Sequence, residues 1–589
     1  MNNISQFSPD GAAGAARSGA LPDKLATAAV CHDAGQLQQA ENLYRDILSK
    51  DPACAPARHR LGVLAFQTGQ VEAALKLIDS AAVLEPENAV FHMSLGAILR
   101  SQGRLQEAEA ACRKSVALDP ENPDAHNNLG NVLKELADPG GALAAYGSVL
   151  SLQPGHVMAS LNLAALHRER NDTDLAFDIL ADIEPLVGET AAFRNEMGLT
   201  YLRAFQPADA EPMFKAALSA DPKNVSYLNN LGLALRSQGK LQSALAAYDL
   251  AINLKPGCGE ARWNRSVVHL MLGQWTGGLK DWHHRRHHTE FQERAFQQAL
   301  WTGKKLRKGR LLVHAEQGVG DEILYASLLS LVLAQTPDVV LEVDARLVPM
   351  MARSYPSIEV VPKADPVAAE ANSRDITARV PLPDLVGLIG ETGPGSDVPV
   401  GYLIADDARV QKFKGWLRAI GPGPYIGISW RSGAGRTGAR KSIPLSAWEP
   451  LLRNGHHTYI NLQYGETAGE ITEAEKKIGV KIHTPPDLDR FTDLDGLAAL
   501  TRALDVTVTS SNVTASLAGA LGGDVRALFA PPELWYWGHD GEHVPFFPNM
   551  RAYRRAQSED WTVLMIRLAE DLAEDAREVS TSNLEGGTF

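Results

Sequence analysis

One segment in the second half of the chain places an acidic side chain where it could act on a hydroxyl group. It reads Glu316-Gln317-Gly318-Val319-Gly320-Asp321-Glu322-Ile323 and follows the strand-like run Arg310–His314. Gly318 and Gly320 allow a tight turn and a close approach of the backbone to a ligand. Asp321 then opens a predicted helix, and its carboxylate could serve as a general base. The alternative is that Asp321 only caps that helix. The segment lacks the Gly-x-Gly-x-x-Gly signature, so it does not predict a nicotinamide site.

A second segment gathers positive charge. Residues 429–445 follow the predicted strand Tyr425–Trp430 and form a glycine-rich loop with four cations, which are Arg431, Arg436, Arg440 and Lys441. Guanidinium and ammonium groups in such a loop could clamp phosphate oxygens. The order of glycines and lysine is not that of a Walker loop. The alternative is a solvated basic loop.

A third segment, residues 508–522, ends a strand with hydroxyl side chains and then begins a helix of small residues. The free amides at the start of that helix suit an anion, near Ser511, Asn512 and Ser516. The alternative is that Ser511 and Asn512 only cap the helix.

Alternating strand-like and helix-like runs must position these three segments. The predicted strands are Arg310–His314, Val339–Val343, Ile358–Val361, Tyr425–Trp430, Thr458–Leu462, Lys481–His483, Val506–Thr509 and Val525–Phe529. The predicted helices are Asp321–Ala334, Leu347–Ser354, Leu445–Arg453, Leu494–Leu504, Val513–Leu521 and Trp561–Ala576. This pattern predicts two lobes with parallel sheets, separated by a loop-rich stretch at 391–401, with ligands at the carboxyl ends of the strands.

The first half of the chain has a 34-residue period. Alanine recurs at Ala40, Ala74, Ala108, Ala142, Ala176, Ala210 and Ala244 without insertion or deletion, and glycine and proline follow the same period in other phases. A unit of this length holds two helices that cannot bury their own apolar face, so consecutive units must stack.

One polar position of this period could bind a polypeptide. Asn128, Asn162, Asn230 and Asn264 share it, while Ser94 and Glu196 interrupt the series. An asparagine amide both donates to and accepts from a peptide backbone, which suits capture of an extended chain. The alternative is that these asparagines stabilise the packing between repeats.

Composition excludes several classes of protein. The formal charge of −13 argues against a nucleic-acid binder. The four cysteines are scattered without metal-like spacing, and no apolar stretch has the length of a membrane span, so we expect reduced thiols in a cytoplasmic protein. Residues 1–20 lack the apolar core of a secretory signal. The histidine-rich run 281–288 could suggest a metal, but a polar connecting helix is the simpler interpretation, and we expect no metal site.

Residues 21–292 resemble eight tetratricopeptide repeats, as in Asn127-Asn128-Leu129-Gly130 and Asn229-Asn230-Leu231-Gly232. Residues 260–575 resemble a GT-B, heptosyltransferase-like glycosyltransferase domain fused behind such repeats, including flagellin-modifying transferases. The motifs are Gln317–Leu324, Ile428-Ser429-Trp430-Arg431, Lys441–Leu445, Asn461-Leu462-Gln463-Tyr464-Gly465 and Leu517–Gly522. The asparagine series is similar to that of O-linked N-acetylglucosamine transferases.

The resemblance implies a role for each segment. Asp321 would be the catalytic base, in an acceptor loop with Gly318, Gly320 and Glu322. The donor would be held by Arg431, Arg440, Lys441, Gln463, Tyr464, Ser511, Asn512 and Ser516. A metal or other cofactor is not implied, since the co-substrate is a nucleotide-sugar. Relatives commonly carry a histidine and threonines where this chain has Asn512, Val513 and Ser516, which implies either a different sugar or lost activity.

The expected protein is therefore multidomain, an all-α tetratricopeptide repeat superhelix followed by an α/β GT-B domain with two Rossmann-like lobes. The expected parts are a tail (1–20), the repeats (21–292), a linker (293–308), an acceptor-side lobe (309–405), a nucleotide-sugar lobe (406–577) and a second tail (578–589). The expected function is transfer of a sugar to a Ser or Thr hydroxyl of a polypeptide held by the repeats, with flagellin as one candidate. The alternatives are a binding scaffold with an inactive transferase domain and a transferase that acts on envelope glycans.

Overall fold

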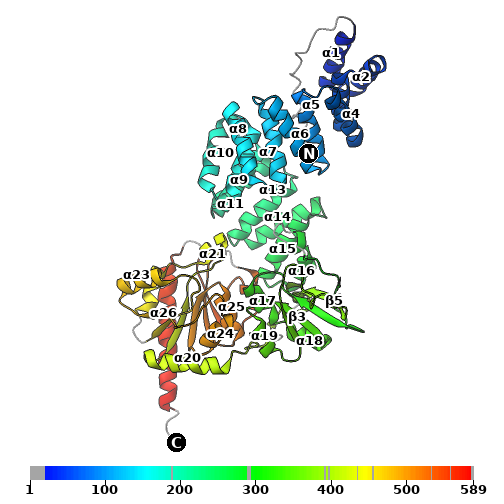
Figure 1. Ribbon diagram of the computed structural model, residues 1–589. Helices are drawn as coiled ribbons and strands as arrows, with labels where there is room; N and C mark the ends of the chain where they lie inside the picture. Colours follow the sequence, from blue (N-terminus) through cyan, green and yellow to red (C-terminus); the bar gives the residue numbers. More distant parts are fainter. Residues whose placement is uncertain are drawn as a thin grey trace. The chain divides into compact units, whose positions relative to one another are not determined.

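The structure is a computed structural model that describes residues 20–187, 190–287, 294–390, 393–395, 398–433, 435–453, 457–531, 534–556 and 559–585. The chain forms two compact units, Met1–Pro222 and Lys223–Phe589, and Figure 1 labels elements of both. Apart from Ala20, the tail predicted at 1–20 lies outside the described residues, as does His288 of the histidine-rich run.

Helices α1 to α16 form consecutive pairs, each with a helix A and a helix B. Their bounds are α1 (Ala20–Asp33), α2 (Leu37–Lys50), α3 (Ala55–Gln67), α4 (Val71–Leu84), α5 (Ala89–Ser101), α6 (Leu105–Leu118), α7 (Pro123–Glu135), α8 (Pro139–Leu152), α9 (Val157–Glu169), α10 (Thr173–Val187), α11 (Ala191–Arg203), α12 (Pro207–Ala220), α13 (Val225–Ser237), α14 (Leu241–Leu254), α15 (Gly259–Met271) and α16 (Trp275–Asp281). The seven alanines that mark the period are fully buried in helices B. The predicted all-α repeat region is confirmed.

A left-handed residue follows helix A in every repeat. Gly35, Gly69, Gly103, Gly239 and Gly273 have φ from 68° to 80°, which costs glycine little. The equivalent residues of the fourth, fifth and sixth repeats are Ala137, Asn171 and Phe205, with φ of 58°, 72° and 60°. The turn therefore keeps its geometry even where glycine is absent.

A second glycine series lets helix A approach helix B closely. A Cβ added to Gly130 would lie 2.6 Å from the Tyr146 ring, and one added to Gly232 would lie 2.4 Å from the Tyr248 ring. Both tyrosine side chains are fully buried, and the Tyr146 hydroxyl donates to Asn131 at 2.7 Å. Glycine at this position of the period therefore marks a close approach of helix A to helix B.

The last repeat packs on the α/β part of the second unit through four tryptophans, which we call the aromatic junction: Trp263, Trp275, Trp282 and Trp535. The Trp282 ring lies 5.2 Å from both Trp263 and Trp535, and Trp275 lies 6.2 Å from Trp535. The Trp282 indole N–H donates to the Pro383 carbonyl at 3.0 Å. These contacts account for the appearance of tryptophan at the end of the repeats, and they place α13 to α16 in one compact unit with the sheets.

Two parallel sheets follow the repeats, as the alternating pattern predicted. The first has the order β1-β5-β2-β3-β4 and the second β11-β10-β9-β6-β7-β8. Strand bounds are β1 (Ala299–Leu300), β2 (Arg310–His314), β3 (Val339–Val343), β4 (Glu359–Pro362), β5 (Ile376–Pro381), β6 (Tyr425–Ser429), β7 (Thr458–Asn461), β8 (Ile482–His483), β9 (Val506–Ser510), β10 (Asp524–Phe529) and β11 (Met550–Arg554). The remaining helices are η2 (Trp282–His287), α17 (Val319–Ala326), α18 (Leu329–Gln335), α19 (Val348–Ser354), η3 (Leu382–Leu388), α20 (Asp407–Ile420), α21 (Gly435–Lys441), η5 (Leu445–Trp448), α22 (Glu449–Leu452), α23 (Ala468–Ile478), α24 (Leu494–Arg502), α25 (Val513–Ala520), η6 (Trp535–Trp537) and α26 (Trp561–Glu585).

Several elements differ from the prediction. Strands β5 and β11 and helices α20, α21 and α23 were not predicted, and the helix predicted at Asp321–Ala334 is broken into α17 and α18. Strand β5 is interrupted by polar residues. One of them, Arg379, contacts the buried His314 at 3.3 Å. The linker predicted at 293–308 contains β1, which pairs with β5. The tail predicted from residue 578 is helical as far as Glu585.

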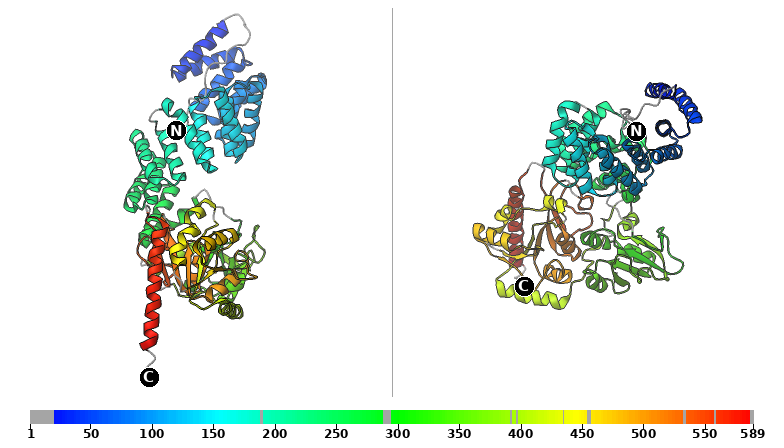
Figure 2. Two further views of the ribbon diagram at one scale, coloured as in Figure 1. Left: turned by 90° about the vertical axis from the view of Figure 1, so that its left-hand side faces the viewer. Right: turned by 45° about the horizontal axis from the view of Figure 1, so that its top comes forward.

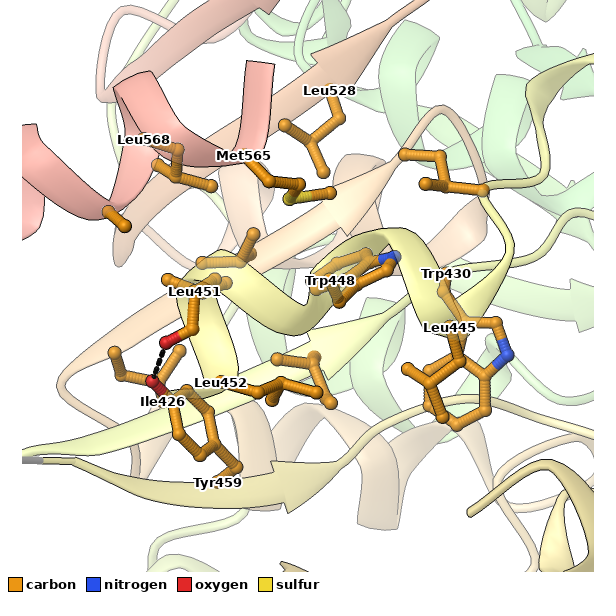
Figure 3. Close-up of a cluster of buried hydrophobic side chains, with 14 of the residues drawn as sticks. Ile426, Trp430, Leu445, Trp448, Leu451, Leu452, Tyr459, Leu528, Met565 and Leu568 are labelled. Atoms are coloured by element: carbon orange, nitrogen blue, oxygen red, sulfur yellow. Dashed lines mark hydrogen bonds between the residues drawn. The ribbon is translucent and has the colours of Figure 1, made fainter. Parts of the chain in front are cut away.

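Helices cover both faces of the second sheet, as a parallel sheet requires. Ile426 and Ile428 of β6 belong to the buried cluster in Figure 3, where Trp448 and the apolar side of α26 also pack. Gly427 faces the other way, and a Cβ there would lie 2.5 Å from Leu504, just after α24. Figure 2 shows α26 as the long red helix beside this sheet.

We predict that Gly130→Ala destabilises the repeats. The added methyl group would collide with the fixed Tyr146 ring, so the free energy of unfolding should fall by about 1–3 kcal/mol. The measurement is urea denaturation of the full chain, followed by far-UV circular dichroism.

The matched control is Gly147→Ala in α8, where an added Cβ meets no atom within 4 Å. Helix propensity should then raise stability by about 0.5–1 kcal/mol. Equal effects of the two substitutions would contradict the close approach at Gly130.

Candidate functional site

The starts of helices α17 and α25 meet, although the two helices follow strands of different sheets. α17 follows β2 and has Gly318 as its N-cap, whereas α25 follows β9 and has Asn512 as its N-cap. A Cβ added to Gly320 would lie 3.6 Å from the Ser516 hydroxyl and 3.7 Å from Val513. The carboxyl ends of both sheets therefore share one site, where ligands bind in folds of this kind.

Asp321 lies at this meeting point. Its Oδ1 accepts a hydrogen bond from the Tyr536 hydroxyl at 3.1 Å. Burial raises the pKa of the Asp321 carboxyl, while the Tyr536 hydrogen bond, the charge of Lys441 and the Gly318 amide act in the opposite direction. The contribution of Gly318 is half of a capping box, so the capping alternative is partly right. A carboxyl with a raised pKa that also faces a cation has the properties of a general base.

Lys441 is the cation that faces Asp321. Burial lowers the pKa of the Lys441 ammonium group, the negative charge of Asp321 raises it, and the neighbouring Arg440 lowers it. The prediction placed these two groups on different segments of one cleft. Each charge is among the causes of the other group's pKa shift, so the two groups act on each other electrostatically.

Arg440 adds a second cation beside Lys441. Its guanidinium group donates to the Pro531 carbonyl, just after β10. Burial, with a smaller effect of Arg555, lowers the pKa of Arg440 to about 10. The segment that carries both cations is helix α21, not the loop that was predicted, and the side chain of Arg436 lies outside the described side chains.

Arg431 holds the fold instead of pointing at a ligand. Its Nη2 donates to the Glu466 carbonyl at 2.6 Å, and its Nε lies 3.4 Å from the Glu470 carboxylate. The assignment of Arg431 to a donor phosphate is therefore not supported by its contacts, which pair the guanidinium group within the second sheet's half.

Gln463 is also an internal support. Its side chain is buried, and its Oε1 accepts from the Ser429 hydroxyl and from the backbone amides of Trp430 and Arg431, at 3.1, 2.9 and 2.7 Å. It therefore fixes the chain where β6 ends. Tyr464 is also an internal support, because its hydroxyl accepts from the Gly433 amide at 2.6 Å.

Asn512 and Ser511 act as structural groups in the hydroxyl-rich turn. The Asn512 side chain accepts from the amides of Thr514 and Ala515, and its Nδ2 donates to the Arg431 carbonyl at 2.9 Å. The Ser511 hydroxyl accepts from the Trp537 indole at 2.9 Å. The capping alternative therefore describes Asn512 well.

Glu322 does not share the site of Asp321. Its buried carboxylate accepts from the Asp344 amide at 2.7 Å, just after β3. Burial raises the pKa of Glu322 to about 7. Glu322 therefore points toward the end of β3, because consecutive residues of a helix point in different directions, and its place in an acceptor loop stays a prediction.

Two groups of residues at the site were not predicted from the sequence. The first is Tyr536, which lies between Trp535 and Trp537; this dense aromatic run was the signal that could have revealed it. The second is the ion cluster of Arg285, Glu316 and Asp384.

Arg285 belongs to η2, immediately after the last repeat, and is buried. Its Nε and Nη2 donate to Glu316 at 3.1 and 2.7 Å, and its Nη1 donates to Asp384. Because Glu316 begins the segment that carries Asp321, this cluster fixes that segment to the end of the repeats.

The asparagine series mostly stabilises repeat packing. Asn264 donates to Asn229 at 2.9 Å, and Asn162 donates to Asn131 at 3.2 Å. Asn128 is buried and Asn230 is half-buried. The packing alternative is therefore supported at Asn162 and Asn264.

No helix in the described ranges is both long enough and apolar enough to cross a membrane. Tetratricopeptide repeat families match residues 32–98, 127–187 and 195–257, and a TPR repeat family matches residues 96–136. The chain is similar to the APC/C hetero-tetramer Cut9–Hcn1, with 20% identity, a TM-score of 0.37 and coverage of 45% of this chain and 52% of that one. It is also similar to a tetratricopeptide repeat protein from Parabacteroides merdae, with 16% identity, a TM-score of 0.37 and coverage of 42% and 98%.

Beyond the repeats, the chain has a relative that spans most of its length. Protein FlbA of Caulobacter vibrioides is 30% identical over 439 residues, which are 70% of this chain and 72% of the relative. An alignment of that length extends past the eight repeats into the α/β part. The chain therefore belongs to the family of protein FlbA.

Proposed function

We propose that this protein is a glycosyltransferase that moves a sugar from a nucleotide-sugar to a Ser or Thr hydroxyl of a polypeptide. The observation that carries this proposal is the position of Asp321 at the meeting point of α17 and α25, where the charge of Lys441 also acts on its carboxyl group. Two parallel-sheet lobes with a site between their carboxyl ends agree with a GT-B arrangement. Asp321 and Lys441 offer a base for an acceptor and a cation for a departing phosphate.

The proposed reaction uses each group once. The acceptor oxygen attacks the anomeric carbon, and the bond from that carbon to the donor phosphate oxygen breaks. Asp321 takes the proton of the acceptor hydroxyl. Lys441 and Arg440 stabilise the charge that develops on the phosphate, and the amide groups at the start of α25 assist.

The repeats would recruit the polypeptide acceptor. Stacked tetratricopeptide repeats present a long surface of helices A, which suits an extended chain. A flagellin is one candidate acceptor, because the resemblance includes flagellin-modifying transferases. Asn162 and Asn264 are engaged in contacts within the repeats. The polypeptide would therefore contact the exposed side chains of helices A.

A binding scaffold with an inactive transferase domain is the second candidate. It is favoured by the internal contacts of Arg431, Gln463 and Asn512, which the resemblance had assigned to the donor. Calorimetric titration with a panel of nucleotide-sugars separates the two candidates, because only a transferase must bind one of them.

We predict that Asp321→Asn abolishes sugar transfer. The amide keeps the size of the side chain but cannot accept the proton, so kcat should fall by roughly 100-fold or more. Transfer is measured by intact-mass analysis of the acceptor polypeptide. The control is Asp338→Asn, an exposed carboxylate at the amino end of β3. Unchanged transfer by Asp321→Asn would remove this residue from the mechanism.

We predict that activity rises with pH above the usual titration range of a carboxyl group. The raised pKa of Asp321 means that its basic form is lost as the pH falls through that raised value. The acid limb of kcat/KM against pH should therefore lie above about pH 4, the ordinary value for aspartate. An acid limb at or below that value would argue that another group is the base.

We predict that Lys441→Ala weakens nucleotide-sugar binding by roughly tenfold or more, because a charge-assisted contact to phosphate is lost. It should also move the acid limb to higher pH, since Lys441 lowers the pKa of Asp321. The control is Lys477→Ala on the exposed side of α23. Equal affinities for both variants, measured by calorimetry, would show that Lys441 does not contact the donor.

A further inference from the structure

Tyr536 joins the two lobes at the proposed base. It belongs to η6, between β10 and β11 of the second sheet, whereas Asp321 belongs to α17, after β2 of the first sheet. The two residues are 215 positions apart in the sequence, and the hydroxyl donates to Asp321 Oδ1 at 3.1 Å. Burial and the nearby Asp321 raise the pKa of Tyr536 well above its ordinary value, so the hydroxyl keeps its proton and can donate it to the carboxylate.

The residues on both sides hold Tyr536 in place. Trp535 is buried and meets Trp275 and Trp282 of the last repeat edge to face, at 6.2 and 5.2 Å. Trp537 is buried, and its indole donates to the Ser511 hydroxyl at 2.9 Å. A rotation of Tyr536 away from Asp321 would therefore disturb the aromatic junction on one side and the start of α25 on the other.

We infer that Tyr536 is a positioning residue of the Asp321 site: its hydroxyl fixes Oδ1 and thereby sets the orientation of the carboxylate that takes the proton of the acceptor. This inference rests on the proposed transferase function. It also makes the last repeat part of the site, because Trp275 and Trp282 support the segment that carries Tyr536.

The titratable groups around Asp321 come from several elements and differ in how they act. Lys441 of α21 acts through its charge, and Tyr325 lies on the same helix as Asp321. The cluster of Arg285, Glu316 and Asp384 acts on Tyr325. Only the Tyr536 hydroxyl is a neutral side-chain donor to the Asp321 carboxylate among these groups. Its removal therefore changes the hydrogen bonding of Asp321 without changing the charge of the site.

The test replaces the hydroxyl and keeps the ring, in the full-length protein. In Tyr536→Phe the pKa of Asp321 should rise further, because a hydrogen bond that favours the carboxylate is lost. The matched control is Tyr553→Phe, since the Tyr553 hydroxyl donates to the Asp571 carboxylate at 2.7 Å on α26, away from the site. The two variants lose the same kind of bond.

The first readout is the carboxyl titration of Asp321, followed by ¹³C NMR of labelled aspartate and assigned by difference with Asp321→Asn. The second is the pH profile of sugar transfer. We expect the Asp321 titration and the acid limb of sugar transfer to move to higher pH in Tyr536→Phe only. Below that limb kcat should be roughly tenfold lower, and KM for the nucleotide-sugar should be unchanged.

An Asp321 titration that does not move, or that moves equally in Tyr553→Phe, overturns the inference. A lower kcat at all pH values with an unmoved acid limb also overturns it, because a merely structural role would give that result. The titration needs no substrate, so it tests the link between Tyr536 and Asp321 separately from the proposed function. A shifted titration in a protein that transfers no sugar would contradict the proposed function and still support that link.

Discussion

A buried guanidinium group, that of Arg285, ties the acid-bearing segment of this protein to its repeats. It follows the last repeat, and it donates to Glu316 on one side and to Asp384 on the other. Burial of the Arg285 guanidinium group is costly unless it is paired, and Glu316 and Asp384, both only partly exposed, supply the paired charges. The geometry of residues 316–321, and with it the position of Asp321, depends on this cluster.

The aromatic junction and the Arg285 cluster act on the same part of the molecule. The junction holds η6, which carries Tyr536, and the ion cluster holds the segment that carries Asp321. The junction begins in the last repeat, and the ion cluster begins in η2, which follows that repeat. The final repeat therefore packs with the α/β part, and both belong to the second compact unit.

Most of the architecture could be predicted from the sequence, but only part of the site could be. The 34-residue period predicted the repeat helices because each side chain there has the same surroundings in every repeat. Asp321 and Lys441 could be predicted because each follows a strand, and the ends of parallel strands converge. The contacts of Arg431 and Gln463 could not, since both side chains bond to backbone groups that are positioned only when β6 and β7 pair. Tyr536 was missed for a related reason: its partner is 215 residues away, and no local pattern records that distance.

The left-handed turns of the fourth, fifth and sixth repeats have a consequence for how the array responds to force. Ala137, Asn171 and Phe205 occupy a backbone conformation that costs side-chain-bearing residues about 1 kcal/mol each, and the adjoining helix α10 also carries Pro185 inside it. In a stacked array each repeat is stabilised only by itself and its neighbours, so such local costs are not shared by the whole. Under force, these three repeats should therefore unfold before the repeats at the ends of the array.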